Sequence, residues 1–297
     1  MEIKITMLGT SGSSPTKERS MPSVALSYNG DVLLMDCGEG TQMQMLRYGI
    51  NSSKVKAIFI SHAHGDHVIG LAGLVRTMAM NRRQAQLDIF VPAGSEKAIN
   101  TLISFDRALI TYKIAVRGAR PGTSYKGRGF SVSAFALNHS VPSCGYAFRE
   151  DDRLRFDEDK CRKLGIRGEM HSLIQELGRL RAGKRVIRLS QVTSREVGKI
   201  VVYASDTRPA SSTVAAAKGA DVLIHESSYS LSEAKLAKER KHSTSAEAAA
   251  VAKKAGAKML VLTHISARYS NTDAMETEAK AVFRNSRAAR DGDVIIV

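Results

Sequence analysis

Tryptophan is absent from this sequence of 297 residues, and cysteine and proline are scarce, with three and six residues. The cysteines, Cys37, Cys144 and Cys161, are odd in number and form no Cys-x-x-Cys pair. This excludes a disulfide framework and predicts a reducing, cytoplasmic compartment, with Cys37 and Cys144 as small buried residues. No run of about 18 apolar residues occurs and no secretory signal is visible, so we expect no membrane span.

Acidic residues are outnumbered, with 29 Asp and Glu against 44 Lys and Arg, which gives a formal net charge of +15. This excess predicts a polyanionic partner, either nucleic acid or an acidic membrane, and a merely solubilising surface is the alternative. With only eight tyrosines and eight phenylalanines, base stacking explains nucleic-acid binding less well than shape and phosphate contacts. The 43% of hydrophobic residues can fill a large core, which excludes a disordered or collagen-like chain.

The hydrophobic pattern predicts strands concentrated early and late in the chain, with helices between them. The predicted strands are 3–8, 24–28, 32–35, 57–60, 87–91, 130–137, 144–148, 199–204, 222–225, 259–263 and 294–297. The predicted helices are 39–48, 67–80, 210–218, 244–255 and 273–285. We therefore expect an α/β fold in which two sheets carry helices on their outer faces.

One segment, residues 150–199, lacks this pattern and is dominated by charge. Six acidic and two basic residues lie between Glu150 and Asp159. Nine basic and two acidic residues follow between Lys160 and Arg188, a net charge of +7. Short helices are expected around Glu158–Leu164 and Met170–Leu180. We interpret residues 150–199 as an arm inserted into the main domain rather than as core.

The most informative string is His62-Ala63-His64-Gly65-Asp66-His67, which follows a predicted buried strand and precedes a predicted helix. Four metal-competent side chains within six residues can surround one point, and imidazole and carboxylate groups are ligands that Zn²⁺ takes in catalytic sites. Gly65 permits a tight backbone path between them. Chance packing of these residues as structural groups is the weaker alternative, because clustered buried polar groups need partners.

Further donors follow other predicted strands. His139, His225 and His264 each end a β-like run, and Asp206 follows Val201–Ser205. A single histidine at a strand end is usually structural, but a metal needs three or four ligands. We therefore expect some of these side chains to complete the site.

The resulting set of donors resembles the ligand set of the metallo-β-lactamase superfamily: His62, His64, Asp66, His67, His139, Asp206 and His264. The resemblance implies an αβ/βα four-layer sandwich spanning residues 1–297, with a metal site at one edge of both sheets. It also implies two Zn²⁺ ions, one held by His62, His64 and His139 and the other by Asp66, His67 and His264, with Asp206 as the bridge.

Further strings resemble one branch of that superfamily, the tRNA 3′-processing endoribonucleases: Pro15–Arg19, Asp36–Gln42, His225-Glu226, Lys241–Thr244 and His264–Tyr269. The resemblance implies a zinc-dependent endoribonuclease that removes the 3′ trailer of precursor tRNA by attack of a metal-activated hydroxide and leaves a 3′-hydroxyl. The family carries a tRNA-binding arm where residues 150–199 lie, and it is typically a homodimer. Membrane and DNA are not expected partners.

Within this resemblance, Asp66 is the expected proton acceptor for the nucleophile, His242 the proton donor for the leaving oxygen, and Glu226 the group that holds His242. A surface salt bridge is the alternative for Glu226 and His242. The expected substrate contacts, whose alternative is ordinary solvated charge, are Pro15, Lys17, Arg19, Arg268, Lys184 and Arg185. His171, in the arm, is not expected to be catalytic.

The sequence also departs from the family pattern. Glu226 is followed by Ser227-Ser228 rather than Ala-Thr, Ala204-Ser205 replaces Ser-Gly before Asp206, and the arm lacks the Gly-Pro-rich signature of bacterial members. A small-molecule hydrolase of the same fold is the second interpretation, although the basic arm would not help a small substrate. A non-catalytic RNA-binding module is the third, and the complete ligand set argues against it.

Overall fold

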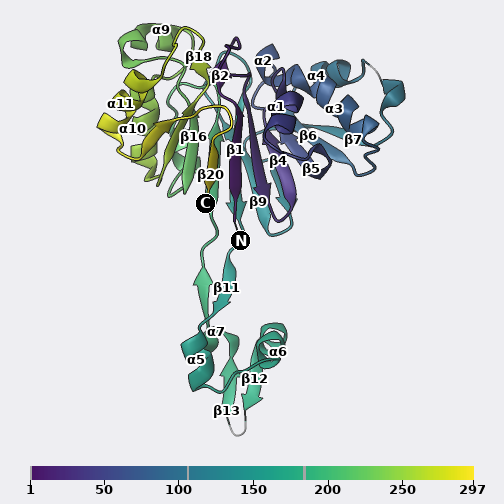
Figure 1. The fold of residues 1–297 in the computed structure, drawn as a ribbon. Coiled ribbons are helices and arrows are strands. Elements are labelled where there is room, and N and C mark those ends of the chain that lie inside the picture. Colours follow the sequence, from purple (N-terminus) through teal and green to yellow (C-terminus); the bar gives the residue numbers. More distant parts are fainter. Residues whose placement is uncertain (1, 106, 183–184) are drawn as a thin grey trace. The chain divides into compact units, whose positions relative to one another are not determined.

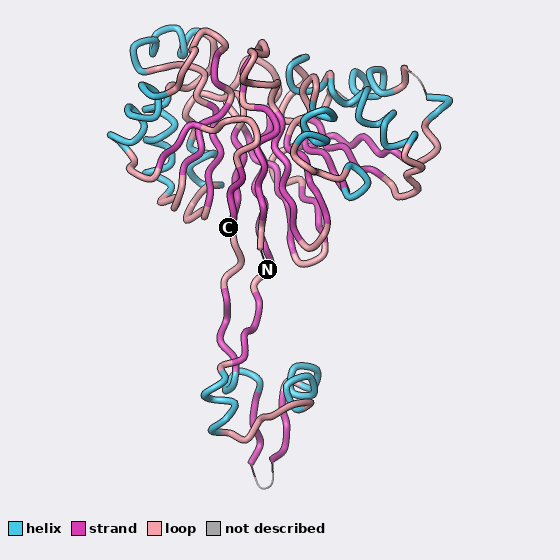
Figure 2. Tube along the Cα trace, viewed as in Figure 1, coloured by secondary structure: helices cyan, strands magenta, loops and turns pink. Residues whose placement is uncertain are grey.

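The computed structural model describes residues 2–105, 107–182 and 185–297, which form two compact units. The first comprises Met1–Phe148 and Ile200–Val297, and the second comprises Arg149–Lys199. In the first unit two seven-stranded sheets face each other, and helices cover their outer sides (Figures 1 and 2). The predicted α/β four-layer sandwich is therefore confirmed.

The first sheet combines an antiparallel edge with a parallel half. Its strands β1, β3 and β20 pair antiparallel, whereas β4, β5, β6 and β7 pair parallel. In sheet order the strands are β20 (Val294–Ile296), β1 (Lys4–Gly9), β3 (Ser23–Tyr28), β4 (Asp31–Met35), β5 (Val55–Phe59), β6 (Leu87–Pro92) and β7 (Ile114–Ala119).

The second sheet contains four parallel strands, β15, β16, β17 and β19. In sheet order its strands are β19 (Ser286–Ala288), β17 (Leu260–Thr263), β16 (Val222–Glu226), β15 (Ile200–Ala204), β10 (Cys144–Glu150), β9 (Phe130–Ala136) and β8 (Ser124–Gly127). A short pair, β2 (Ser11–Gly12) with β18 (Ile265–Ser266), links loops that follow one strand of each sheet.

Three apolar clusters hold the layers together. Aromatic side chains fill the space between the sheets, where the rings of Tyr28 and Phe148 lie 5.6 Å apart and those of Phe59 and Phe90 5.1 Å apart. The central strands are apolar on both faces because helices bury their outer side as well. The helices on the first sheet are α1 (Thr41–Arg47), η1 (Ser52–Lys54), α3 (Gly70–Met80), α4 (Glu96–Ile103) and η2 (Arg107–Leu109). Those associated with the second are α8 (Ser211–Ala216), η3 (Leu231–Glu233), α9 (Ala234–Glu239), α10 (Ser245–Ala255) and α11 (Asp273–Val282).

Two predicted helices of the first unit differ from the structure by more than a small shift of their ends, one in continuity and the other in length. The helix expected from His67 to Met80 is divided at Ile69 into α2 (Gly65–Val68) and α3. A side chain at Gly70 would clash with the carbonyl oxygen of Gly38, so only glycine allows α3 to approach that loop. The helix expected to reach Asn285 ends at Val282, and the following residues form the unpredicted edge strand β19.

The second unit has its own small core, formed by Cys161, Ile166, Ile174, Ile187 and Val192. Its elements are β11 (Arg153–Phe156) paired with β14 (Thr193–Glu196), β12 (Arg179–Ala182) paired with β13 (Arg185–Arg188), α5 (Glu158–Lys163), α6 (Met170–Leu177) and α7 (Leu189–Val192).

The prediction that the helix beginning at Met170 extends to Leu180 is wrong, because this helix ends at Leu177. Gly178 adopts the left-handed conformation, with φ of 71°, and terminates α6 so that Arg179 begins a strand. Among the described residues, no helix is long and apolar enough to cross a membrane.

Candidate metal centre

The candidate site lies at the carboxyl ends of parallel strands from both sheets of the first unit. His62 follows β5, Asp206 follows β15, and His264 follows β17. Because β4 and β5 are parallel in one sheet and β15, β16 and β17 are parallel in the other, the residues that follow them gather at one edge. This is the edge at which the sequence predicts the donors.

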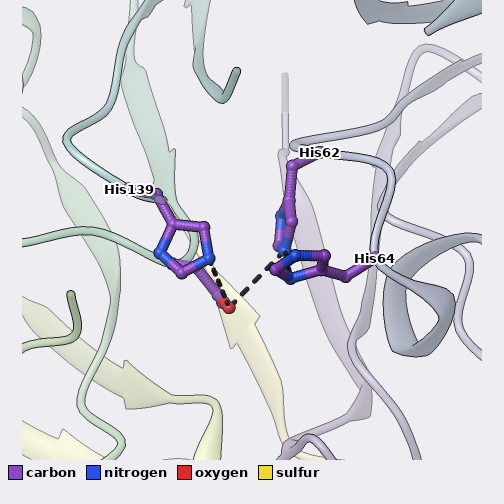
Figure 3. A group of neighbouring side chains, drawn as sticks. His62, His64 and His139 are labelled. Atoms are coloured by element: carbon purple, nitrogen blue, oxygen red, sulfur yellow. Dashed lines mark hydrogen bonds and ion pairs between the residues drawn. The ribbon is translucent and has the colours of Figure 1, made fainter. Parts of the chain in front are cut away.

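A first group of donors consists of His62, His64, His139 and Asp206, whose ligand atoms lie within 4.8 Å of one another. Figure 3 shows the three imidazoles turned toward a common point. His62 Nε2 lies 2.9 Å from His64 Nδ1 and 3.6 Å from Asp206 Oδ2, and His139 Nε2 lies 3.8 Å from the same oxygen.

A second group consists of Asp66, His67 and His264. His67 Nε2 lies 3.3 Å and His264 Nε2 3.6 Å from Asp66 Oδ2. The same two nitrogens lie 3.6 Å and 3.1 Å from Asp206 Oδ1. Asp206 therefore presents Oδ2 to the first group and Oδ1 to the second, which is the arrangement that a bridging carboxylate requires.

The donor atoms fit metal ions better than they fit one another. His67, His139 and His264 each have a buried Nε2 with no hydrogen-bond partner in the described part of the chain. Ligands at about 2.0–2.1 Å around a tetrahedral Zn²⁺ lie about 3.3 Å apart, close to most of the spacings here. One cation in each donor group, between these nitrogens and the carboxylate oxygens, would satisfy them all.

The ring nitrogens that face away from the centre are held by hydrogen-bond partners. The Nδ1 atom of His67 contacts Asp36 Oδ2 at 2.8 Å, and that of His62 contacts Ser61 Oγ at 3.0 Å. The Nδ1 atom of His139 contacts the Lys241 carbonyl at 3.1 Å. Such contacts fix the orientation and tautomer of a metal-binding histidine.

Asp36 supports one of the donor histidines, although the sequence analysis names it only as the start of the Asp36–Gln42 string. It is fully buried, and its Oδ2 accepts hydrogen bonds from Ser61 Oγ at 2.8 Å and from the Tyr203 hydroxyl at 2.7 Å, besides its contact with His67. The available signal was its place directly after β4, the parallel neighbour of the strand that precedes His62.

Burial and mutual charge shift the pKa values at the centre. Burial raises the pKa of Asp206, but the charges of His264 and His67 outweigh it and lower that pKa well below its usual range. The pKa of Asp66 is also lowered, because contacts with His264 and His67 outweigh its burial. Burial lowers the pKa of His62 and of His139. The centre therefore favours ionised carboxylates and, at these two histidines, neutral imidazoles, the forms that bind metals.

Glu226 and His242 form a pair beside the metal centre. Glu226 is fully buried, and its Oε1 lies 2.9 Å from His242 Nδ1 while also accepting from the Thr207 and Ser243 amides. Burial lowers the pKa of His242, but the charge of Glu226 and the hydrogen bond to it prevail and raise that pKa to about 9. The sequence-based alternative of a surface salt bridge is inconsistent with this burial.

The Pro15–Arg19 loop follows β2. Pro15 and Lys17 are exposed. Arg19 is turned inward, since its Nη1 donates to Thr10 Oγ1 at 2.7 Å and to the Ala289 carbonyl at 2.6 Å. These bonds give Arg19 an anchoring role in the fold.

The other expected substrate contacts have mixed surroundings. Arg268 forms an ion pair with Glu233 and lies over the Tyr229 ring, with 5.1 Å from its Cζ to the centroid. Arg185 is exposed on β13, and Lys184 lies outside the described residues. His225 is buried and points Nδ1 at the Glu226 carbonyl, 2.7 Å away, and the structure does not place it among the donor groups.

Comparison with known proteins agrees with this architecture. Residues 3–166, more than half of the chain, match the family model described as anti-Pycsar protein Apyc1. Ribonuclease Z of Gemmatimonas aurantiaca is 41% identical, with 99% of this chain and 96% of the relative covered. Ribonuclease Z of Methanosarcina acetivorans is 39% identical, with 97% and 96% covered.

Solved structures give the same picture. The short form of human tRNase Z has a TM-score of 0.72 and 26% identity, with 98% of each chain covered. The metallo-β-lactamase fold protein YhfI from Bacillus subtilis, at 21% identity, shares the fold with a TM-score of 0.72 over the whole of both chains. The chain therefore belongs to the family that the Apyc1 model describes and, over nearly its full length, to the ribonuclease Z family with the metallo-β-lactamase fold.

Proposed function

We propose that this chain is an endoribonuclease that removes the 3′ trailer from precursor tRNA and leaves a 3′-hydroxyl on the tRNA. The observation that carries the proposal is the meeting of two donor groups on the two oxygens of Asp206, in a chain whose full-length curated relatives are named ribonuclease Z. The basic second unit supports a large polyanionic substrate over a small one.

We propose two Zn²⁺ ions as the cofactors, one held by His62, His64 and His139 and the other by Asp66, His67 and His264, with Asp206 shared. The mixed imidazole and carboxylate donors support zinc over magnesium or calcium, which prefer oxygen ligands alone. When bound, such ions make hydroxide available near neutral pH and offset the negative charge of a scissile phosphate. Asp66, whose pKa is strongly lowered, suits the ligand role better than that of a proton acceptor.

His242 would donate the proton that the leaving 3′-oxygen requires. Because its Nδ1 is bonded to Glu226, Nε2 is the atom that carries the transferable proton. Its raised pKa keeps the imidazole protonated at neutral pH. Glu226, held by backbone amides on one oxygen and by Ser228 on the other, fixes the donor in place.

The second unit would bind the body of the tRNA through phosphate contacts. On the β12–β13 hairpin, Arg179 lies directly opposite Arg188, and both side chains are exposed. Like charges in this register repel each other, and a phosphate between them would relieve the repulsion. Arg185 is exposed on the same hairpin. In the first unit, Lys17 is the exposed cation of the Pro15–Arg19 loop and would contact a phosphate there.

We further propose a cytoplasmic homodimer. Three cysteines that remain free and buried support a reducing compartment. The side chains of Met43 and Leu46 on α1 are 62% and 71% exposed, which supports an apolar contact between two copies. Light scattering coupled to size-exclusion chromatography tests the dimer, and a monomer at micromolar concentration would contradict it.

The function is tested with purified protein, Zn²⁺ and a precursor tRNA labelled at its 5′ end. We expect a single cut directly after the discriminator base, and no cut by the Asp206→Ala variant. Bis(p-nitrophenyl) phosphate serves as the small phosphodiester in parallel. Hydrolysis of that compound without cleavage of the tRNA would instead favour a small-molecule phosphodiesterase.

A further inference from the structure

Ser228 lies in the loop after β16 and contacts three side chains of the site. Its hydroxyl oxygen is 2.9 Å from Glu226 Oε2, 2.9 Å from His264 Nδ1 and 3.2 Å from His242 Nδ1. The side chain is buried, with the residue only 4% exposed. Ser227 and Ser228 together stand where the family usually has Ala-Thr after the glutamate.

The number of available hydrogens fixes the direction of these bonds. A serine hydroxyl has one hydrogen, and an ionised carboxylate can only accept. Burial raises the pKa of Glu226, but the charge of His242 and the bond to it lower that pKa, so the carboxylate is ionised. The hydroxyl of Ser228 therefore donates to Glu226 Oε2, and its oxygen accepts the N–H of His264 Nδ1.

This direction determines which nitrogen of His264 faces the metal centre unprotonated. With the proton on Nδ1, the lone pair is on Nε2, which lies 3.1 Å from Asp206 Oδ1 and 3.6 Å from Asp66 Oδ2. That nitrogen is buried and has no hydrogen-bond partner among the residues that the structure describes. The tautomer selected by Ser228 is thus the one that can bind a metal.

We propose that Ser228 is a positioning residue that holds His264 in its metal-binding tautomer and ties this ligand to the Glu226–His242 pair. The inference rests on the proposed metal centre and adds a link between its second donor group and the proton donor. Through this link, the metal centre and the loop that carries His242 would become ordered together.

A matching arrangement on the other sheet supports the inference. Ser61 Oγ donates to Asp36 Oδ2 at 2.8 Å and lies 3.0 Å from His62 Nδ1. Because the single hydroxyl hydrogen of Ser61 is donated to Asp36, the Nδ1–H of His62 must be the donor to Ser61 Oγ. The lone pair of His62 Nε2 is then available to the first donor group. Each donor group thus contains one histidine held by a serine that is itself bonded to a buried carboxylate.

The test compares Ser228→Ala with two matched variants. Ser228→Thr keeps the hydroxyl, and Ser227→Ala removes a neighbouring buried hydroxyl that has no hydrogen-bond partner in the described chain. Zn²⁺ affinity is measured on the full-length protein by competition with a chromophoric chelator, and thermal unfolding of metal-free samples reports folding. We expect Ser228→Ala to weaken the binding of one of the two ions about 10- to 100-fold, whereas Ser228→Thr and Ser227→Ala bind like the parent.

A second readout reports the tautomer directly. In long-range ¹H–¹⁵N NMR spectra of the metal-free parent, His264 should carry its proton on Nδ1, and Ser228→Ala should show a mixture of tautomers. Parental zinc affinity and an unchanged tautomer in Ser228→Ala would overturn the positioning role alone. A parent protein that binds no zinc would overturn the metal centre and this inference with it. Equal losses in Ser227→Ala would show that packing, not the hydroxyl, matters.

Discussion

At the scale of single residues, Asp36 forms several hydrogen bonds, and only one of them is to a proposed ligand. Its buried carboxylate accepts from His67, Ser61, Tyr203 and the Ser61 amide, 2.6 Å from Oδ1. Asp36 contacts Nδ1 of His67 and belongs to neither donor group, so its effect on a metal would pass through the orientation of His67.

The Asp36→Ala variant should therefore lose both stability and metal affinity. Several buried donors are left without an acceptor, and we expect the free energy of unfolding to fall by about 3–5 kcal/mol. Zinc affinity should fall about 10- to 100-fold. Urea unfolding and chelator competition measure the two effects. Asp36→Asn, which keeps the shape and loses the charge, should lie between parent and Asp36→Ala, and a stable Asp36→Ala with parental zinc binding would contradict the argument.

The pH dependence of cleavage should report His242. Its folded pKa of about 9 lies above the ordinary 6.5, so its pairing with Glu226 stabilises the fold fully below pH 6.5 and is lost as pH rises through 9. The protonated donor disappears over the same range, and bound cations shift this limit downward, so kcat should fall on the alkaline side at or below pH 9. In the Glu226→Gln variant, this alkaline fall in kcat should occur at lower pH.

The variant His242→Ala distinguishes a proton donor from a metal ligand. His242→Ala should reduce kcat about 10²- to 10⁴-fold, remove the alkaline limb and leave the zinc content unchanged. His242 could also be a ligand, since Asp206, His242 and His264 form a third group of possible donors and His242 Nδ1 lies 3.9 Å from Asp206 Oδ2. A loss of zinc in His242→Ala would show that it is one. Steady-state rates from pH 6 to 10, with the metal content of each variant determined in parallel, separate the two roles.

The ligands and their supports differ in how far the sequence can predict them. His62, His64, Asp66 and His67 are adjacent in sequence, so spacing alone predicts that their side chains converge. The contacts of Ser228 and Asp36 join residues that are 36 and 31 positions apart, and they depend on which strands become neighbours. No local pattern reports such neighbours. Arg19 illustrates the same limit, because only the fold reveals its bond to Ala289.

At the scale of elements, most strands and the outer helices are predictable because burial imposes a regular apolar period. Some edge strands are not: the pattern predicts β20 but not β7 or β8, whose mixed polar and apolar residues reflect partial exposure. The end of α6 at Gly178 had a local signal, a glycine followed by charged residues, which the helical pattern around it concealed. The strand β2 has only two residues and therefore no hydrophobic periodicity, although it reaches the candidate metal centre.

The strand β2 passes close to the side chain of His264. A Cβ atom at Gly12 would lie 2.6 Å from both Cε1 and Nδ1 of His264, so the close approach of β2 to this proposed ligand requires glycine there. Gly12→Ala should displace the imidazole and weaken zinc binding roughly tenfold or more while the fold persists. Ser14→Ala, an exposed change in the same loop, is the control.

Zinc titration and circular dichroism of both variants measure the effect of Gly12→Ala. If Gly12→Ala unfolds, glycine is needed at this position for the pairing of β2 with β18 and not for the position of His264. Parental affinity in a folded Gly12→Ala would mean that His264 has room to move aside, and the tight contact would then have no part in metal binding.

At the scale of the whole molecule, the charge and the chemistry are divided between two units. The donor groups lie in Met1–Phe148 and Ile200–Val297, whereas the basic run from Lys160 to Arg188 lies in Arg149–Lys199. The second unit builds its core from its own residues only. Its removal therefore leaves the three larger clusters of the first unit intact.

Replacing residues 151–198 by two glycines should separate substrate binding from chemistry. The amide of Glu150 donates to the Lys199 carbonyl at 2.9 Å, so the ends to be joined already lie side by side. We expect parental zinc content and parental hydrolysis of bis(p-nitrophenyl) phosphate, together with a large rise in KM for precursor tRNA. The intact chain should lose tRNA affinity steeply with salt, by about 0.7–0.9 log units of affinity per log unit of salt for each phosphate contact, and the deletion variant should show a shallower slope. Loss of both activities would make the second unit part of the catalytic fold, because a binding arm cannot be needed for a substrate too small to reach it.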